Sequence, residues 1–157
     1  MTITEKIDNI TAIDEAHYGT VIPAPRSVKI ELTGRCNFRC SYCARSMRLR
    51  EQQDMDFEFY RAVVRDMHDS GVEELGLFYL GESFLYPKLV EAIEYAKEVG
   101  FKYVFLTTNG SVAWPETIEA CMRAGLDSLK FSLNYADEKQ FEALTRVKGR
   151  LFYRVLD

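Results

Sequence analysis

Apolar residues along the chain follow two alternating spacings, one typical of strands and the other of amphipathic helices. Short segments rich in β-branched and aromatic residues are separated by longer segments in which apolar residues recur every three or four positions. The predicted strands are 27–32, 75–80, 103–108 and 129–133, and the helical stripes are 57–67, 89–96 and 114–122. Because strands that alternate with helices pair in parallel through right-handed crossovers, this pattern predicts an α/β fold built on a parallel sheet.

The expected helix boundaries coincide with residues that favour helix ends. A glycine able to adopt the left-handed C-cap conformation follows each stripe, at Gly71, Gly100 and Gly125. Helix starts are expected near Pro87 and Pro115, and Asp137 is the expected N-cap of a further helix. Caps and periodicity therefore divide the chain at the same points.

Polar and sulfur-containing residues gather where the predicted strands end. The cysteine-rich segment 36–43 follows the first strand, 80–83 the second, 107–110 the third, and 132–134 the fourth. Parallel α/β sheets and barrels bind their ligands at the C-terminal ends of the strands. We therefore expect these four segments to meet on one polar rim.

The composition excludes several classes of protein. A chain of 157 residues that is 47% apolar and 13% aromatic can form one domain with a buried core. Its net charge of −4 comes from interspersed signs, so no nucleic-acid or membrane partner is expected. No stretch approaches the length of a membrane span, and the N-terminus lacks the pattern of an export signal. We expect a cytoplasmic protein with reduced cysteines.

Three of the four cysteines lie in one short segment, Cys36-x3-Cys40-x2-Cys43. Three thiolates are too few to close a tetrahedral zinc site, but they can hold a cubic [4Fe-4S] cluster with one iron left open. An open metal position is typical of a site that performs chemistry.

Structural zinc is the alternative interpretation, with Cys121, His17 or His68 as the fourth ligand. All three residues are distant in sequence from the cysteine segment. Cys121 also falls on an apolar helical stripe, which favours a core position, and the two histidines are expected at the surface or at helix caps.

Four features in this order resemble the radical S-adenosylmethionine (radical SAM) superfamily: C-x3-C-x2-C, Gly81-Glu82, Asn109-Gly110, and a serine in the fourth strand. From about Val28 onward, the resemblance implies a partial parallel (β/α) barrel with about four of the family's six β/α units. It divides the chain into an N-terminal extension, 1–27, and a core domain, 28–157, incomplete at its C-terminus. Segment 141–157 is similar to peptide-modifying members, whose C-terminal SPASM domain has no counterpart here, so we expect a truncated chain.

The resemblance implies a role for each matching residue. Cys36, Cys40 and Cys43 would bind three irons, and S-adenosylmethionine would chelate the fourth. Gly81 and Glu82 match the motif for the cofactor's amino group, although the usual Gly-Gly-Glu-Pro is here Leu80-Gly81-Glu82-Ser83. The other cofactor contacts that it implies are Tyr42 beside the adenine, Ser83 within the motif, Asn109, Ser132 and Asn134.

The activity implied is reductive cleavage of S-adenosylmethionine to a 5′-deoxyadenosyl radical, which abstracts hydrogen from a peptide or small-metabolite substrate. A low-potential electron donor such as flavodoxin or ferredoxin would be a partner. The alternative from another class is a non-catalytic iron–sulfur or zinc-binding module for electron transfer or protein interaction.

Several of these residues also have a structural interpretation. Gly81 and Asn109-Gly110 are typical of turns. Glu82 is alternatively a solvated loop acid, and Ser132, which faces opposite its two apolar neighbours, a core hydroxyl.

A basic run, Arg45, Arg48 and Arg50, follows the cysteines. It is compatible with an anionic substrate, but an exposed, solvated face is the simpler interpretation.

Overall fold

The computed structural model of the chain describes residues 19–20, 23–47 and 52–156. His17, Arg48 and Arg50 lie outside these residues, so the interpretations given for them stay predictions. No helix in the described ranges is both long and apolar enough to cross a membrane.

Four parallel strands form one sheet in the order of the chain. They are β1 (Ser27–Lys29), β2 (Glu74–Gly76), β3 (Tyr103–Thr108) and β4 (Ser128–Phe131). The register places Leu75 of β2 beside Val28 on one side and Val104 on the other. The strand order and direction confirm the predicted α/β fold with a partial parallel barrel.

β1 and β2 end earlier than predicted. The chain leaves the sheet just after Ile30 and Leu77, whose amides make the last ladder bonds of 2.8 and 2.9 Å. The segments that follow pack against each other, and the Glu82 amide donates to the Arg35 carbonyl over 2.8 Å. The apolar alternation that predicted longer strands thus continues into two loops that lie together.

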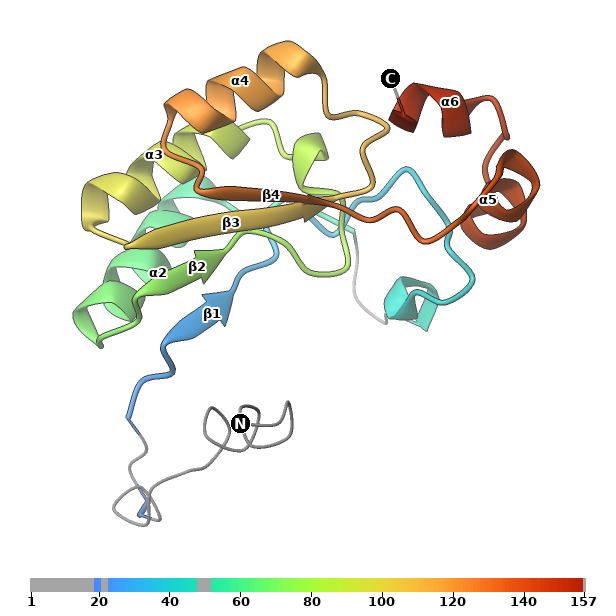
Figure 1. The fold of residues 1–157 in the computed structure, drawn as a ribbon. Coiled ribbons are helices and arrows are strands. Elements are labelled where there is room, and N and C mark those ends of the chain that lie inside the picture. Colours follow the sequence, from blue (N-terminus) through green and yellow to red (C-terminus); the bar gives the residue numbers. More distant parts are fainter. Residues whose placement is uncertain (1–18, 21–22, 48–51, 157) are drawn as a thin grey trace, which may run out of the picture.

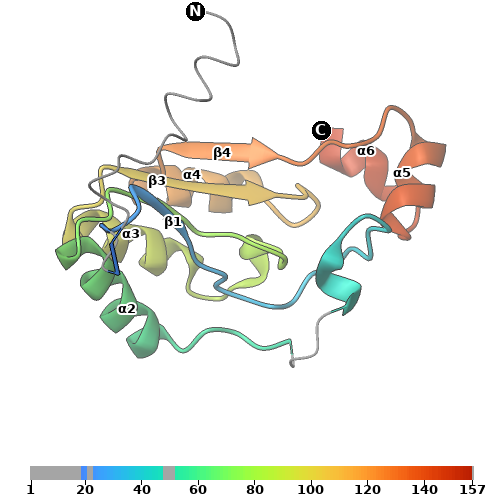
Figure 2. The same ribbon diagram turned by 90° about the horizontal axis from the view of Figure 1, so that it is seen from below.

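Three helices, α2 (Phe57–Asp69), α3 (Leu89–Val99) and α4 (Pro115–Arg123), cover one face of the sheet (Figures 1 and 2). α2 begins where the Asp56 carboxylate accepts from the Phe59 amide over 2.9 Å. α4 begins at Pro115, as expected. Trp114 precedes this proline and is 53% exposed, and Met122 is 63% exposed, so the predicted apolar stripe is not buried at these two positions.

The predicted glycine caps are confirmed by positive φ angles of 99° at Gly71, 117° at Gly100 and 102° at Gly125. Asp137 is also confirmed as an N-cap, because its carboxylate accepts from the Gln140 amide over 2.8 Å. α3 begins at Leu89, with Lys88 as its N-cap, so the helix start predicted near Pro87 is confirmed.

The main core lies between the sheet and these three helices. Its fully buried members from both layers are Leu75, Leu77, Val104, Leu106, Tyr60, Val64, Ile93 and Ala96. Cys121 belongs to the same core and is fully buried, and this burial raises its pKa to about 11. The core interpretation of Cys121 is therefore confirmed.

α5 (Glu138–Thr145) and α6 (Leu151–Leu156) lie beyond the C-terminal strand ends, as does the short helix η2 (Ala44–Met47) after the cysteines (Figures 1 and 2). Phe38 of the cysteine segment and Phe141 of α5 are both buried and pack edge to face, with ring centres 5.5 Å apart. The amides of Arg39 and Ser41 donate to carbonyls in the last turn of α5 over 3.0 and 2.8 Å. α5 therefore supports the cysteine segment.

Candidate functional site

The four polar segments predicted to meet at the strand ends do meet, around a cavity of about 210 Å³. All three clustered cysteines line it. So do most of the predicted cofactor contacts, namely Tyr42, Gly81, Glu82, Asn109, Ser132 and Asn134. The structure thus brings together residues that lie almost 100 positions apart in the chain.

Ser83 is not among the residues that line this cavity. Its side chain is buried, and its hydroxyl donates to the Leu77 carbonyl over 2.7 Å. Ser83 begins the short helix η3 (Ser83–Leu85), which turns the chain away from the cavity. The observed role of Ser83 is to hold the end of β2.

The three clustered cysteines form no disulfide bond and are half-buried. Burial raises the pKa of the Cys36 thiol, against a hydrogen bond from the Phe38 amide. Burial likewise raises the pKa of Cys40, against a hydrogen bond from Tyr42. These two thiols therefore hold their protons near neutral pH until a metal displaces them.

Within the described ranges, no group of three or more His, Cys, Asp or Glu side chains is arranged to hold a single metal ion. Tetrahedral zinc, with Zn–S bonds of about 2.3 Å, would hold its thiolates within about 4 Å of one another. Cys121 is in the core, and His68 ends α2 with its ring 5.6 Å from that of Phe101, so neither reaches the cysteine cavities. Structural zinc thus lacks both of these proposed fourth ligands.

Glu82 connects the ends of β2 and β3. Its carboxylate accepts from the Thr108 hydroxyl and the Asn109 amide, both over 2.7 Å, and from the Phe84 amide over 3.2 Å. It is only 2% exposed, so the interpretation as a solvated loop acid is wrong. Burial raises the pKa of this carboxyl, although the three hydrogen bonds oppose the shift.

Gly81 lies where two loops approach closely. A Cβ atom at this position would be 1.8 Å from the Thr33 carbonyl oxygen, well inside van der Waals contact. The Glu31 carboxylate accepts from the amides of Leu80 and Gly81, over 3.0 and 3.1 Å. Glycine is therefore required here for space, and its φ is not among the positive values of the described residues.

Asn109 forms the turn that was predicted for Asn109-Gly110, and its cofactor contact stays a prediction. Its side-chain oxygen accepts from the Ser111 amide over 2.9 Å, which is the hydrogen bond of an Asx turn. Its side-chain nitrogen donates to Asn37 over 2.9 Å and approaches the Cys36 sulfur at 3.9 Å. Asn37 in turn donates to the Ser111 hydroxyl over 2.7 Å, which closes a ring of three polar side chains.

The end of β4 reaches the cysteine segment through Asn134, which donates to the Tyr42 hydroxyl over 3.3 Å. Ser132 lines the cysteine cavity, whereas its neighbours Phe131 and Leu133 line a separate groove. This arrangement confirms the predicted alternation of Phe131, Ser132 and Leu133, although β4 ends at Phe131, before the predicted residue 133.

Tyr135 also lines the cavity, and nothing in its sequence context singled it out. Burial, together with the charged forms of Tyr42 and Cys40, raises the pKa of Tyr135 to about 12. Its hydroxyl and the Arg45 Nε atom are the buried side-chain polar atoms of the described chain that have no hydrogen-bond partner. Asn37, Ser111 and Tyr135 are thus site residues that sequence reasoning missed; only Asn37, inside the cysteine motif, carried a signal.

The three cysteines also line a second cavity, of about 470 Å³, whose other lining residues include Arg39, Arg45, Arg146 and Gln52. Arg45 is half-buried and donates to the Phe38 carbonyl over 3.2 Å and to Gln52. For Arg45, the interpretation as an exposed face is therefore wrong. The cysteines separate a polar cavity at the strand ends from a basic one.

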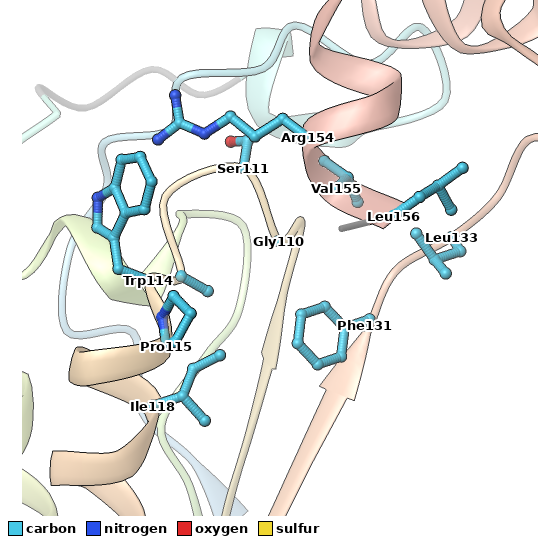
Figure 3. Close-up of a pocket in the computed structure, with 11 residues that line it drawn as sticks. Gly110, Ser111, Trp114, Pro115, Ile118, Phe131, Leu133, Arg154, Val155 and Leu156 are labelled. Carbon is cyan, nitrogen blue, oxygen red and sulfur yellow. The ribbon is translucent and has the colours of Figure 1, made fainter.

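A larger groove, of about 720 Å³, lies between the start of α4, the end of β4 and α6 (Figure 3). Its lining is mainly apolar, with Ile118 and Phe131 facing the side chains of α6. The Arg154 guanidinium lies over the Trp114 ring, 3.8 Å from its centre. Because no cysteine lines this groove, it is separate from the site described above.

Comparison with known proteins places these residues in context. The Radical SAM superfamily profile matches residues 30–157. A probable GTP 3′,8-cyclase of Methanothermobacter marburgensis is 33% identical over 121 residues, which cover 76% of this chain and 39% of that protein. PqqA peptide cyclase of Gluconobacter oxydans is 32% identical over 131 residues, which cover 83% of this chain and 36% of that protein. The chain thus spans less than half of either relative.

Solved structures show the same fold. Streptococcus suis SuiB bound to S-adenosylmethionine superposes with a TM-score of 0.71 at 21% identity, over 90% of this chain and 32% of that one. BtrN in complex with AdoMet and 2-DOIA superposes with a TM-score of 0.65 at 17% identity, over 82% of this chain and 54% of that one.

Proposed function

Because the chain belongs to the radical SAM superfamily, we propose that residues 28–157 form the part of a radical SAM enzyme that binds a [4Fe-4S] cluster and S-adenosylmethionine. Residues 1–27 precede this core as an extension. The observation that supports the proposal most is the convergence of three half-buried cysteines, none of them in a disulfide bond, with residues from the other three strand ends on one cavity.

The residues at the cysteine cavities suit an anionic iron–sulfur cluster. Cys36, Cys40 and Cys43 supply three thiolates and leave a fourth iron for another ligand. Among the described residues, two buried donors lack partners, Arg45 Nε and the Tyr135 hydroxyl, and both belong to residues that line these cavities. A ligand rich in acceptors would satisfy both donors, which supports the fit.

When bound, the cluster supplies the electron that cleaves S-adenosylmethionine into methionine and a 5′-deoxyadenosyl radical. The chain's own residues would bind S-adenosylmethionine and position it. Gly81, Asn109, Ser132, Asn134 and Tyr42 line the cavity at the strand ends and would contact S-adenosylmethionine. Glu82 also lines this cavity, and the hydrogen bonds from Thr108, Asn109 and Phe84 would hold its carboxylate in place for the cofactor's amino group.

The substrate class follows from the relatives only in outline. One relative is named a PqqA peptide cyclase, and SuiB has been solved with its precursor peptide SuiA. Other relatives are named GTP 3′,8-cyclases. We infer a peptide or small-metabolite substrate from which hydrogen is abstracted.

The basic cavity suggests where an electron donor would approach. Arg39, Arg45 and Arg146 line it together with the cysteines, and none of them pairs with a carboxylate of the described residues. An acidic carrier such as flavodoxin or ferredoxin matches this charge. Free thiols and a reduced cluster suit the cytoplasm, the location that we propose.

Anaerobic reconstitution of the chain with iron and sulfide tests the proposal. We expect a [4Fe-4S] cluster whose electron paramagnetic resonance (EPR) spectrum changes when S-adenosylmethionine is added. Cys40→Ala should lose the cluster, and Cys121→Ala, the control, should keep it because Cys121 lies in the core.

If the protein instead bound a tetrahedral metal ion and contained no labile sulfide, the proposed [4Fe-4S] cluster would be contradicted. A cluster whose spectrum ignores S-adenosylmethionine would instead favour a non-catalytic iron–sulfur module.

A further inference from the structure

Tyr135 presents a hydroxyl group for which the described residues supply no partner. The oxygen is buried and makes no hydrogen bond within the described structure. A buried hydroxyl without a partner is costly, and such groups are rare in folded proteins. An acceptor that is not part of the chain would remove this cost.

The ring of Tyr135 is held firmly, so its hydroxyl has a defined position. It packs edge to face on Phe141, with ring centres 4.6 Å apart, and lies 6.0 Å from Phe152. Phe141 is fully buried and belongs to α5, whose last turn also supports the cysteine segment. The same helix therefore positions both the Tyr135 ring and the cysteines.

The surroundings of the hydroxyl indicate what the acceptor is. Tyr135 lines the cavity of about 210 Å³ with all three clustered cysteines. Among titratable groups, Tyr42 and Cys40 are the ones that act on it. The Tyr42 hydroxyl already accepts from Asn134 and donates to Cys40, so the group near Tyr135 that can carry negative charge as an acceptor is sulfur.

A second donor without a partner lies near the same cysteine. Arg45 Nε is the other such buried atom, and the Arg45 guanidinium acts electrostatically on both Cys36 and Cys40. Two unsatisfied donors, one tyrosine and one arginine, thus flank Cys40 from different cavities. Two unsatisfied donors beside the same thiol are better explained by one anionic ligand that both would contact than by chance.

We propose that the Tyr135 hydroxyl donates a hydrogen bond to anionic sulfur at the cluster site, either the Cys40 thiolate or the cluster sulfide beside it. This inference rests on the proposed function. A hydrogen bond to sulfur stabilises the more negative, reduced cluster more than the oxidised one, so it raises the reduction potential. Tyr135 is then a residue that tunes the cluster and takes no direct part in the reaction.

Tyr135→Phe isolates this hydrogen bond, because it removes the hydroxyl and keeps the ring on Phe141. Tyr153→Phe is the matched control: its ring also contacts Phe152, but its hydroxyl pairs with Glu138 over 3.2 Å. Both variants and the parent chain are reconstituted anaerobically. Their iron and sulfide contents and their midpoint potentials are measured by EPR-monitored redox titration without S-adenosylmethionine.

We expect equal iron and sulfide in all three proteins. In Tyr135→Phe, the equilibrium constant for reduction should fall about tenfold, a shift of about 59 mV to more negative potential for a one-electron couple. Electron–nuclear double resonance should lose one exchangeable proton coupling. The Tyr153→Phe cluster should match the parent in both measurements.

Thermal unfolding of the metal-free proteins distinguishes this role from a structural one, because the two roles predict opposite changes in the unfolding midpoint of Tyr135→Phe. Tyr135→Phe removes a buried hydroxyl without a partner, so its midpoint of thermal unfolding should equal or exceed that of the parent. A clear fall would mean that the hydroxyl has a partner within the chain, and it would overturn the proposal.

The remaining outcomes separate the two proposals. If the parent assembles a cluster and Tyr135→Phe leaves its potential unchanged, only the role of Tyr135 is overturned. If the variant differs only when S-adenosylmethionine is present, the hydroxyl binds that cofactor, and the assignment to sulfur is wrong. If the parent assembles no cluster, the proposed function and the role of Tyr135 both fail.

Discussion

At the scale of single residues, the site depends on side chains whose polar atoms are committed to neighbouring loops. Glu82 makes three hydrogen bonds that join two strand ends, and Asn109 is shared among Ser111, Asn37 and Cys36. Such residues position the backbone of the site, so their replacement should lower the free energy of unfolding as its first effect, and any effect on the reaction should follow from that.

Gly81→Ala should lower the free energy of unfolding by about 1–3 kcal/mol, because the new Cβ would overlap the Thr33 carbonyl and push two loops apart. Urea unfolding of the metal-free chain measures this. Gly71→Ala is the control for backbone conformation alone, since φ is 99° there and no atom lies within 4 Å of the new Cβ. Retention of the parent's stability in Gly81→Ala would refute the close approach.

Glu82→Gln keeps the shape of the side chain, but its amide nitrogen carries two N–H groups and cannot accept, whereas the oxygen of a protonated carboxyl carries one O–H and can still accept from the Asn109 amide or the Thr108 hydroxyl. At pH 4.5 the free energy of unfolding should fall by about 1–3 kcal/mol. Glu58→Gln, on the exposed side of α2, should change it by less than about 0.5 kcal/mol.

The same pair of variants has a signature in pH. Burial raises the pKa of Glu82 above its ordinary 4.5, so the folded chain binds this proton more tightly than the unfolded chain does. The stability contributed by Glu82 is therefore fully present below pH 4.5 and is lost as pH rises through the folded pKa. The deficit of Glu82→Gln should shrink between pH 4.5 and 7; a deficit that grows would contradict the direction of the shift.

At the scale of elements, α5 acts as the support of the cysteine segment. Its last carbonyls accept from the amides of Arg39 and Ser41, and its buried Phe141 packs on Phe38 and Tyr135. Helix ends leave carbonyls without intrahelical partners, and here the cysteine segment satisfies two of them. The helix that follows the fourth strand thus completes the site that begins after the first.

Phe141→Ala should remove this support, at a cost of about 3–5 kcal/mol for a buried phenylalanine. Hydrogen exchange should accelerate first at the Arg39 and Ser41 amides, before exchange in β3. Val64→Ala, in the main core, is the control, because it should loosen the sheet and helices without this selectivity. Equal protection of the two loop amides in both variants would show that α5 does not hold the segment.

At the scale of the whole molecule, charge is distributed unevenly despite a net value of −4. Arginines gather at the cavity on one side of the cysteines, while the side at the strand ends is lined by amides, hydroxyls and the buried Glu82. This division would let an electron enter from one side of the cluster and a sulfonium cofactor bind on the other.

Arg39→Glu should therefore slow cluster reduction by an acidic flavodoxin about tenfold at low ionic strength, and less in high salt. Stopped-flow absorbance measures the rate. Arg123→Glu changes the net charge equally, but it lies on α4 and should leave the rate unchanged. Similar slowing in both variants would indicate a general charge effect and would argue against docking at the basic cavity.

Local patterns were sufficient for the order of the elements. Strand and helix periodicity depends on neighbours within a few positions, and so do caps such as Asp137 and Gly100, which is why these predictions are confirmed. The same reasoning failed at Trp114 and at the ends of β1 and β2, where a proline and the packing of two loops overrode the apolar pattern.

The sequence by itself determined the fold class, the cysteine motif and the strand ends at which the site would form, because each is encoded by short-range spacing. Only the tertiary structure decided that Glu82 is a buried brace, that Ser83 faces away from the cavity, and that Tyr135 lines it. Those properties depend on contacts between loops far apart in the chain, and the closeness of such contacts is set by packing. The spacing of residues along the sequence does not encode how closely these loops pack.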